Sequence, residues 1–498
     1  MDLNILKFKT RNNRYIFDGN SSKIFVEDES MDYILENWEK NSDVLSLWDN
    51  YDNKNEGITF SQFVKKYEYI AKLINKGYFL KRQVINEKLD IHKEKYNTSN
   101  MALIIVLTGQ CNLRCKYCVY GEHYPDEVFY DDIKDMSFDT ARKAIDEYVE
   151  FYKDKVAHGY FKIPSIFFYG GEPLLKKKLI KRIVEYTKLI EFKCNFYMTT
   201  NGVLLDEEFS EFCVDNNFTI TFSLDGYKFN HDRNRVSVND KPTFDIVYEN
   251  IKKYEIIKKN KNNMNITSFN CCYDDYTDIE KCVDFFIANG EIFGPMYVVY
   301  SYINPYETDY YEWLEDNSID EKCFQSSFKK VYEKFINGIY KSKIQKAATQ
   351  NLFLGMHSMS IRNTSLERSA LNNCCMPLTK IAVYPDGIYT ICERMNKKMP
   401  IGNVDDGINY KVIQEIIDKM SSNFTQGRCK ECTVKNLCNI CFQFVDEECT
   451  VKDEYCKREK EAIINRLMQY CDILEKNPNA FEESEFDEKE VELLKVLG

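Results

Sequence analysis

The most informative part of the sequence for the fold is Ala102-Leu-Ile-Ile-Val-Leu-Thr108-Gly-Gln-Cys111-Asn-Leu-Arg-Cys115-Lys-Tyr-Cys118. It begins with an apolar run that fits a buried strand and is far too short to span a membrane. Three cysteines follow at the spacing C-x3-C-x2-C. Three thiolates so placed can bind one face of a four-iron cluster and leave one iron open, whereas a structural zinc site needs four ligands. A zinc site that takes its fourth ligand from elsewhere is the alternative.

Strands and helices alternate outward from this stretch. Apolar runs predict strands at residues 102–108, 165–169, 195–199, 219–224, 265–270 and 296–301. Helical periods lie between them near residues 137–149, 179–190, 206–216, 244–257 and 279–289. Six such repeats indicate a parallel sheet, open or partly closed into a barrel, with function at the carboxyl ends of its strands.

Composition narrows the function classes. Hydrophobic residues at 44% and charged residues at 29% of 498 residues are ordinary globular values, and the length suggests about three domains. The net charge of −12 argues against binding nucleic acid or an anionic membrane through bulk electrostatics. The start, Met1-Asp2-Leu3-Asn4, lacks the basic and apolar segments of a signal peptide, so we expect a cytoplasmic protein. Nineteen cysteines then indicate metal sites, reactive thiols and core residues rather than disulfides.

Glycine and polar residues follow the next three predicted strands. Gly170-Gly171-Glu172-Pro173 ends the second strand, where glycines allow close backbone approach and Glu172 can accept hydrogen bonds from an ammonium group. Asn201-Gly202 follows the third strand, and Ser223-Leu224-Asp225-Gly226 ends the fourth. Asn-Gly and Asp-Gly also favour simple turns, so that interpretation stays open.

Together these elements resemble the signature of radical S-adenosylmethionine (SAM) enzymes. The resemblance implies a [4Fe–4S] cluster on Cys111, Cys115 and Cys118 whose open iron chelates SAM, with reduction splitting SAM to a 5′-deoxyadenosyl radical. It implies further contacts near SAM from Tyr117, Gly170, Gly171, Glu172, Pro173, Asn201, Ser223, Asp225 and Arg235. For Arg235 the alternative is an ordinary surface arginine.

A second cysteine-rich region runs from Cys374 to Cys456, with a hairpin expected around Pro385-Asp386-Gly387. Two C-x2-C pairs alone would fit a zinc ribbon. The whole array resembles a SPASM domain, although two residues, not the usual three, separate Cys438 from Cys441. The resemblance implies auxiliary cluster I on Cys375, Cys392 and Cys441, and auxiliary cluster II on Cys429, Cys432, Cys438 and Cys456, with Cys449 as the alternative to Cys456. Cluster I would then have an open iron that could bind a substrate thiolate.

The remaining cysteines fall on apolar-periodic segments, and we expect them in the core: Cys194, Cys213, Cys271, Cys272, Cys282, Cys323 and Cys471. Near the N-terminus, strand-like segments around a turn precede two helices and a further short strand at 78–80. This pattern resembles a winged-helix RiPP recognition element, which binds the leader of a ribosomally made peptide as an added strand. The alternative is a structural cap.

We therefore expect an α/β chain of five parts. They are a winged-helix recognition element (1–90), a partial (β/α)6 radical SAM barrel (100–305), a helical bridge (306–370), a SPASM domain (371–460) and a C-terminal helix with an acidic tail (461–498).

This order resembles maturases of cysteine-rich peptides. It implies SAM, three [4Fe–4S] clusters, a precursor peptide and an electron donor such as flavodoxin or ferredoxin. The implied reaction joins a cysteine sulfur to carbon as a thioether, with Glu393 as the base. The alternatives are a sulfatase-type formylglycine maturase, a peptide carbon–carbon crosslinking or epimerising enzyme, and a non-enzymatic electron carrier or leader-binding scaffold.

Overall fold

In the computed structural model the chain forms two compact units. The first contains residues 1–89, 354–373 and 416–481; the second contains residues 90–353, 374–415 and 482–498. The structure describes residues 3–38, 43–51, 57–81, 90–92, 102–124, 134–317, 321–355, 357, 379–395, 399–438, 440–441, 444–446 and 448–481. The expected ligand Cys375 and the expected acidic tail lie outside these residues. No helix in the described part of the chain has the length and apolar character needed to cross a bilayer.

The second unit is built on a ten-stranded sheet with the order β13-β12-β11-β10-β4-β5-β6-β7-β8-β9. Strands β4 to β9 pair in parallel, which confirms the six predicted strands. Their bounds are Ala102–Val106, Ser165–Tyr169, Asn195–Thr200, Thr219–Ser223, Thr267–Tyr273 and Met296–Tyr302. All five residues of β4 are buried, as an apolar strand in the middle of a covered parallel sheet should be.

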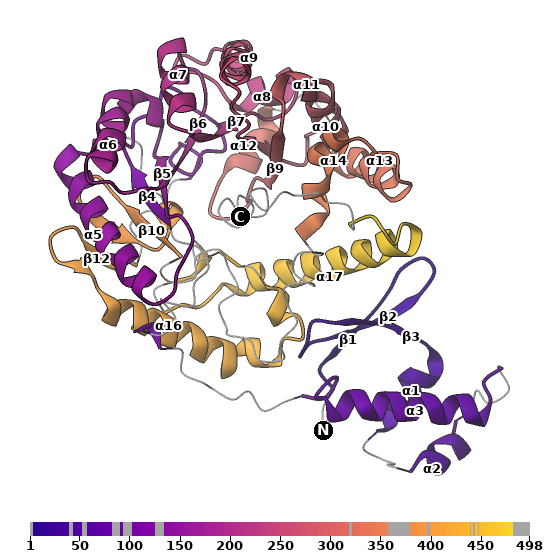
Figure 1. The fold of residues 1–498 in the computed structure, drawn as a ribbon. Helices are drawn as coiled ribbons and strands as arrows, with labels where there is room; N and C mark the ends of the chain where they lie inside the picture. The colour runs from indigo at the N-terminus through magenta and orange to yellow at the C-terminus, as the bar shows by residue number, and fades with distance from the viewer. Residues whose placement is uncertain are drawn as a thin grey trace. The chain divides into compact units, whose positions relative to one another are not determined.

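Helices follow these strands and lie on the outer side of the curved sheet (Figure 1). They are α5 (Phe138–Ala157), α6 (Lys177–Leu189), α7 (Glu207–Asp215), α8 (Lys228–Asn234), α9 (Phe244–Asn260), α10 (Ile279–Ala288) and α11 (Gly290–Phe293). Ser137 caps α5 by accepting from the amide of Thr140, as expected from the sequence. After β9 the chain forms α12 (Tyr310–Asn317), α13 (Phe324–Ile336) and α14 (Lys343–Thr349).

A hairpin extends the sheet beyond β4. Strands β10 (Lys380–Val383) and β11 (Ile388–Thr390) are antiparallel, and Gly387 takes the positive φ of +85° that their turn requires, so the expected hairpin is confirmed. Strand β10 pairs in parallel with β4, from Lys380 opposite Ala102 to Val383 opposite Ile105. The short strands β12 (Gly402–Asn403) and β13 (Gly407–Ile408) complete this edge. The hydroxyl of Tyr120, just after the first cysteine loop, donates to the carbonyl of Glu393, so the segment after β11 lies near that loop.

The first unit begins with a sheet of β1 (Ile5–Lys9), β2 (Arg14–Asp18) and β3 (Ile24–Glu27), in that order. Helices α1 (Glu29–Asn37), α2 (Val44–Asp49) and α3 (Phe60–Asn75) follow. Thr59 and Gln62 form a capping box at the start of α3. The expected strand at 78–80 is only a single bridge between Leu3 and Leu80, and α2 was not predicted.

Alternation along β2 divides its side chains between two cores. Ile16 faces a core made with α1 to α3, which includes Ile34 and Phe63. Tyr15 and Phe17 face the opposite way, toward a helix from the far end of the chain, α17 (Asp453–Lys476). Helix α16 (Tyr410–Thr425) begins in the second unit and continues into the first.

Candidate active site

The first cysteine loop follows β4 and is fixed by backbone hydrogen bonds to the segment after β7. The amides of Arg114 and Lys116 donate to the carbonyls of Val236 and Asn234, at 2.8 and 3.0 Å. The amide of Cys118 donates to the carbonyl of Cys115 at 3.0 Å, which closes a turn inside the loop. The loop is therefore held at the carboxyl end of the parallel sheet, where the sequence predicted the site.

The three thiols of this loop, Cys111, Cys115 and Cys118, are half-buried and close enough to influence one another. Burial raises the pKa of Cys115 to about 12, the Arg235 guanidinium counteracts part of this, and Cys118 adds to it. A bound metal cation would lower the pKa of these thiols and so oppose the effect of burial. The donor set therefore suits a cationic iron cluster.

The glycine pair at the end of β5 lies directly against the start of this loop. Gly171 donates its amide to the carbonyl of Thr108 at 2.8 Å, and Glu172 donates to Gln110 at 2.9 Å. A Cβ at Gly171 would lie 2.3 Å from the carbonyl oxygen of Gln110, and one at Gly170 would lie 2.4 Å from that of Thr108. Only glycine permits this approach, so the motif sets the position of Cys111.

Glu172 lies buried beside the loop with its carboxylate already oriented. It accepts from the hydroxyl of Thr200 at 2.6 Å and from the amides of Asn201 and Leu174 at 2.8 and 2.9 Å. Burial raises its pKa, and these three donors counteract part of the rise. Pro173 opens the short helix η2 (Pro173–Lys176) that continues the motif.

Asn201 connects β6 (Asn195–Thr200) to the loop through its side-chain amide. The amide donates to Asn112 at 2.9 Å and lies 3.7 Å from the sulfur of Cys111. Ser223 is buried at the end of β7. The structure thus brings the residues predicted at the ends of three strands together beside one cysteine loop.

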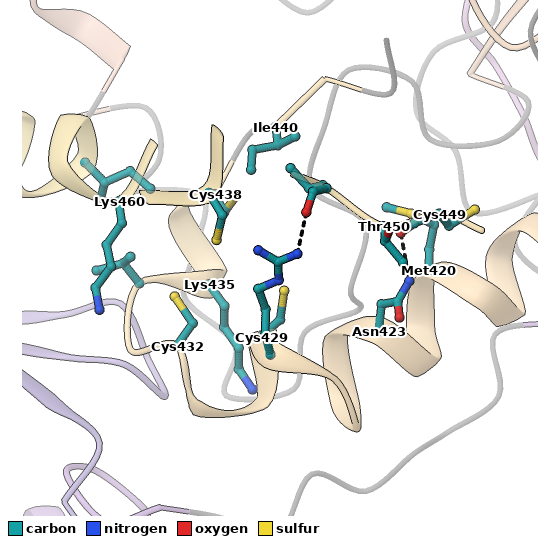
Figure 2. Close-up of a pocket in the computed structure, with 15 residues that line it drawn as sticks. Met420, Asn423, Cys429, Cys432, Lys435, Cys438, Ile440, Cys449, Thr450 and Lys460 are labelled. Atoms are coloured by element: carbon teal, nitrogen blue, oxygen red, sulfur yellow. Dashed lines mark hydrogen bonds between the residues drawn. The ribbon is translucent and has the colours of Figure 1, made fainter. Parts of the chain in front are cut away.

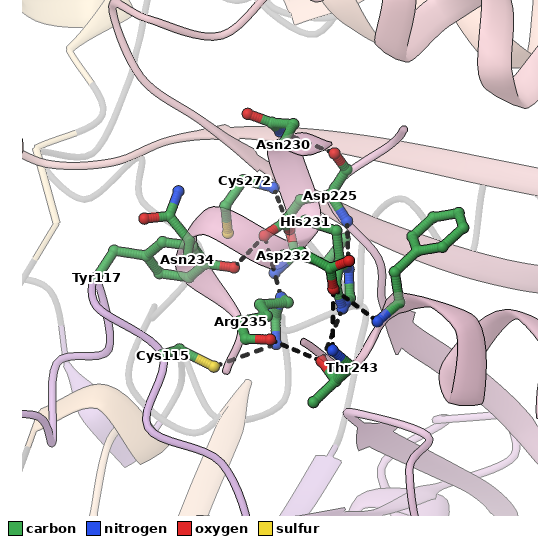
Figure 3. A network of polar contacts seen from close by, with 12 residues as sticks. Cys115, Tyr117, Asp225, Asn230, His231, Asp232, Asn234, Arg235, Thr243 and Cys272 are labelled. Carbon is green, nitrogen blue, oxygen red and sulfur yellow. Dashed lines mark hydrogen bonds and ion pairs between the residues drawn. The ribbon is translucent and has the colours of Figure 1, made fainter. Parts of the chain in front are cut away.

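Asp225 and Arg235 form a buried ion pair beside the loop (Figure 3). Nε of Arg235 lies 3.1 Å from Oδ2 of Asp225, and its Nη1 donates to the sulfur of Cys115 at 3.6 Å. The hydroxyl of Tyr117 donates to the same Asp225 oxygen at 2.5 Å. Burial raises the pKa of Asp225, and Arg235 and Tyr117 counteract part of the rise. Arg235 is therefore no surface arginine.

Cys272, which we expected in the core, belongs to this network. It lies at the carboxyl end of β8, is only half-buried, and donates its amide to Oδ1 of Asp225 at 3.0 Å (Figure 3). Tyr310 of α12, which had no sequence signal, packs edge-on against Tyr117 and donates to Asp274 at 2.7 Å. The position of Cys272 at a strand end was the signal that could have identified it.

Glu393 lies next to the hairpin and near the cysteine loop. The thiol of Cys392 donates to Oε2 of Glu393 at 3.2 Å. The hydroxyls of Tyr120 and Tyr384 donate to the Glu393 carbonyl at 3.0 and 2.7 Å, which ties the hairpin to the residues just after Cys118. Burial by itself raises the pKa of Glu393, but Lys380 and Arg394 outweigh it and the pKa is lowered, so the carboxylate is ionised at neutral pH.

The later cysteines of the first unit surround a cavity of about 330 Å³ (Figure 2). Its lining includes Cys429, Cys432, Cys438, Cys449 and Cys456. Burial raises the pKa of the Cys429 thiol, and the nearby Cys432 and Cys456 raise it further.

Cys449 differs from the other cysteines of this cavity. Its sulfur lies 3.9 Å from the carbonyl of Ile416 in α16, and its charged neighbours are Lys419, Asp446 and Glu448 rather than cysteines. This environment favours Cys456 as the fourth member of the set.

The ligands expected for auxiliary cluster I cannot be compared in space in this structure. Cys375 lies outside the described residues, and Cys392 and Cys441 belong to different units. Among the described residues, no three His, Cys, Asp or Glu side chains are gathered closely enough to bind one metal ion. A four-iron cluster binds its cysteines through different irons and needs no such close grouping.

Comparisons with known proteins agree with this geometry. The Radical SAM superfamily profile matches residues 105–272. The radical SAM cyclopropyl synthase TigE of Paramaledivibacter caminithermalis is 29% identical over 181 residues, covering 36% of this chain and 37% of TigE. The cysteine-type anaerobic sulfatase-maturating enzyme of Clostridium novyi is 25% identical over 352 residues, covering 68% of this chain and 86% of that enzyme.

A solved structure, native anSMEcpe with bound AdoMet and Cp18Cys peptide, has the same fold. It superimposes with a TM-score of 0.51 at 20% identity and covers 76% of this chain and 98% of that one. The chain thus contains a radical SAM domain with homology to anaerobic sulfatase-maturating enzymes. Such a domain implies SAM and a [4Fe–4S] cluster, which the thiols of the first loop fit.

Proposed function

We propose that the chain is a radical SAM maturase that forms thioether crosslinks in a cysteine-rich, ribosomally made precursor peptide. The observation that carries the proposal is the convergence of the three loop thiols with the Gly170-Gly171-Glu172 cradle and the Asp225–Arg235 pair at one end of the parallel sheet. In this proposal Cys111, Cys115 and Cys118 hold the SAM-binding cluster. When bound, this cluster and SAM supply a radical that removes hydrogen from carbon.

In this proposal, different residues around the loop would bind SAM and position the loop. Three protein donors fix the orientation of the Glu172 carboxylate, and its remaining lone pairs would accept from the SAM ammonium. Gly170 and Gly171 let the backbone that leads into Cys111 lie directly against the end of β5, which sets the position of the loop. Asp225, Tyr117 and Arg235 position the Cys115 side of the loop, with Asn201 on the Cys111 side and Ser223 at the end of β7.

Glu393 accepts the substrate proton in this proposal. Its lowered pKa keeps it ionised at neutral pH, and it lies 3.2 Å from the sulfur of Cys392. Each thioether requires the loss of a hydrogen atom from carbon, a proton from the thiol and one electron. The SAM-derived radical would take the hydrogen atom, Glu393 would take the proton, and the electron would leave through the auxiliary clusters. An external donor such as flavodoxin or ferredoxin would supply the electron that reduces the first cluster. Cluster II would be bound by Cys429, Cys432, Cys438 and Cys456, and cluster I by Cys375, Cys392 and Cys441.

The N-terminal sheet supports leader recognition. Strand β3 is the end strand of this sheet, and Val26 on it is 65% exposed. An extended peptide can add to such an edge through backbone hydrogen bonds. We therefore assign the leader of the precursor to the β3 edge.

A sulfatase-type maturase is the second candidate, favoured by the long match to the Clostridium novyi enzyme. That family usually carries Asp where Glu393 stands here, and it lacks the N-terminal sheet and helices. This departure favours the thioether reaction.

The two candidates predict different products. The reconstituted protein should be incubated anaerobically with SAM, a reductant and either a cysteine-rich precursor or a sulfatase-derived peptide, and the products analysed by mass spectrometry. A thioether removes two hydrogen atoms per linkage and blocks alkylation of one thiol. Conversion of cysteine to formylglycine also exchanges sulfur for oxygen. Formylglycine as the sole product would overturn the thioether proposal.

A further inference from the structure

We propose that the metal bound by Cys429, Cys432, Cys438 and Cys456 organises the N-terminal sheet, so that cluster occupancy and the leader-binding edge are coupled. The inference rests on the proposed auxiliary cluster II. It assigns this site a role in holding the recognition module, in addition to electron transfer. All residues involved belong to the first unit.

The loop between two of the ligands is part of the core of the sheet. Val434 and Leu437 lie between Cys432 and Cys438 and are each 1% exposed. They pack in one buried cluster with three aromatic side chains of β1 and β2, and Cys432 and Cys438 pack against the same cluster. The aromatic residues are Phe8, Tyr15 and Phe17. The short loop between Cys432 and Cys438 therefore packs against the sheet and also carries the two ligands.

Polar contacts fix the register of this packing. The side-chain amide of Asn436 donates to the carbonyl of Gly19 at 2.9 Å, just after β2. A Cβ added at Gly19 would lie 2.7 Å from the carbonyl oxygen of Thr433 and 2.6 Å from Oδ1 of Asn4. The backbone after β2 therefore lies directly against the backbone of the 433–437 loop.

Helix α17 provides a second connection. Cys456 lies in its first turn, and Ile463 and Leu467, about two and three turns later, join the aromatic cluster. Near its other end, Glu475 accepts from the hydroxyl of Tyr15 at 2.7 Å and from the side chain of Asn12 at 3.0 Å. Both segments that supply ligands therefore contact the sheet.

Metal binding stabilises a fold when the ligands lie on segments that are not ordered without the metal. Because the sheet and the metal share the 433–437 loop, removing the metal should loosen the sheet. Coupling free energies are reciprocal, so a change that displaces the sheet should also weaken metal retention.

The test uses the full chain in a background that leaves cluster II as the only iron site. This background carries alanine at the ligands of the other two sites: Cys111, Cys115 and Cys118 of the first loop, and Cys375, Cys392 and Cys441 of cluster I. Hydrogen exchange of β1–β2 is compared with and without iron, and also after Cys432→Ser. We expect exchange to be about tenfold faster without the metal. Strand β5 of the second unit serves as the internal reference and should not change.

The reciprocal arm measures iron release to a chelator after Gly19→Ala. The added methyl group would meet the Thr433 carbonyl and the Asn4 side chain but no ligand, so the 433–437 loop should shift and release should be about tenfold faster. Gly355→Ala is the matched control, because it lies in the same unit with no atom within 4 Å of its added Cβ, and release should match the parent. Asn436→Ala removes the hydrogen bond to the Gly19 carbonyl and should speed iron release by a smaller factor.

The outcomes separate two failures. If the background protein binds no iron, the proposed cluster is wrong and the inference fails with it. If iron binds but β1–β2 exchange and Gly19→Ala release are both unchanged, the cluster stands and the coupling is overturned.

Discussion

Replacing Gly171 by alanine should disable SAM cleavage without unfolding the barrel. The new Cβ would lie 2.3 Å from the carbonyl oxygen of Gln110 and 2.4 Å from that of Gly109. Ordinary van der Waals contact begins near 3.4 Å, so the backbone leading into Cys111 must retreat by about 1 Å. A misplacement of about 1 Å at a reacting centre can reduce the rate about 100-fold. The methyl group cannot be accommodated by rotation, because both neighbours are backbone atoms.

The assay is 5′-deoxyadenosine formation by the anaerobically reconstituted variant, with iron content and circular dichroism measured on the same samples. We expect an intact fold and about a 100-fold lower rate. Gly355→Ala, with open space around its added Cβ, should retain the parental rate. A Gly171→Ala protein that cleaves SAM as fast as the parent would refute the argument that this glycine positions the loop.

Three further substitutions test separate parts of the account. Arg235→Leu leaves the buried Asp225 carboxylate without its cation, so the free energy of unfolding of the apo-protein in urea should fall by about 3–5 kcal/mol. Adding Asp225→Asn should restore part of this loss. Equal urea unfolding curves for parent and variant would contradict a stabilising ion pair. Glu393→Gln should reduce peptide product about 100-fold or more while 5′-deoxyadenosine still forms, as expected for a lost base; an unchanged product yield would remove Glu393 from the reaction. Val26→Asp should weaken binding of a labelled leader peptide about tenfold in fluorescence anisotropy, whereas the exposed Val156 of α5, changed to Asp, should not; similar affinities would place the leader elsewhere.

Much of the fold was readable from local pattern. Apolar runs of strand length with polar ends predicted β4 to β9, and Pro-Asp-Gly predicted the hairpin of β10 and β11. The cysteine loop was recognisable because its spacing and its position after a strand agree. The pairing of β10 with β4 was not, because it joins segments separated by most of the chain.

Side-chain partnerships were harder to predict. Asp225 and Arg235 were both singled out, but their ion pair depends on the path of the chain around α8. Cys272 was assigned to the core because apolar periodicity does not show which residue of β8 reaches the open end of the sheet. Likewise, no local signal indicates that Phe17 and Leu437, some 420 residues apart, share a core. Such contacts depend on tertiary packing, which sequence periodicity does not encode.

The most direct test of the central claim is SAM cleavage by the intact chain. The protein should be reconstituted anaerobically with iron and sulfide, reduced, and given SAM, and 5′-deoxyadenosine should be quantified beside a Cys115→Ala variant. We expect 5′-deoxyadenosine from the parent protein and none from the variant. A fully iron-loaded, reduced parent that leaves SAM intact, or a variant that still cleaves it, would contradict the assignment of the Cys111–Cys118 loop as the radical-generating site.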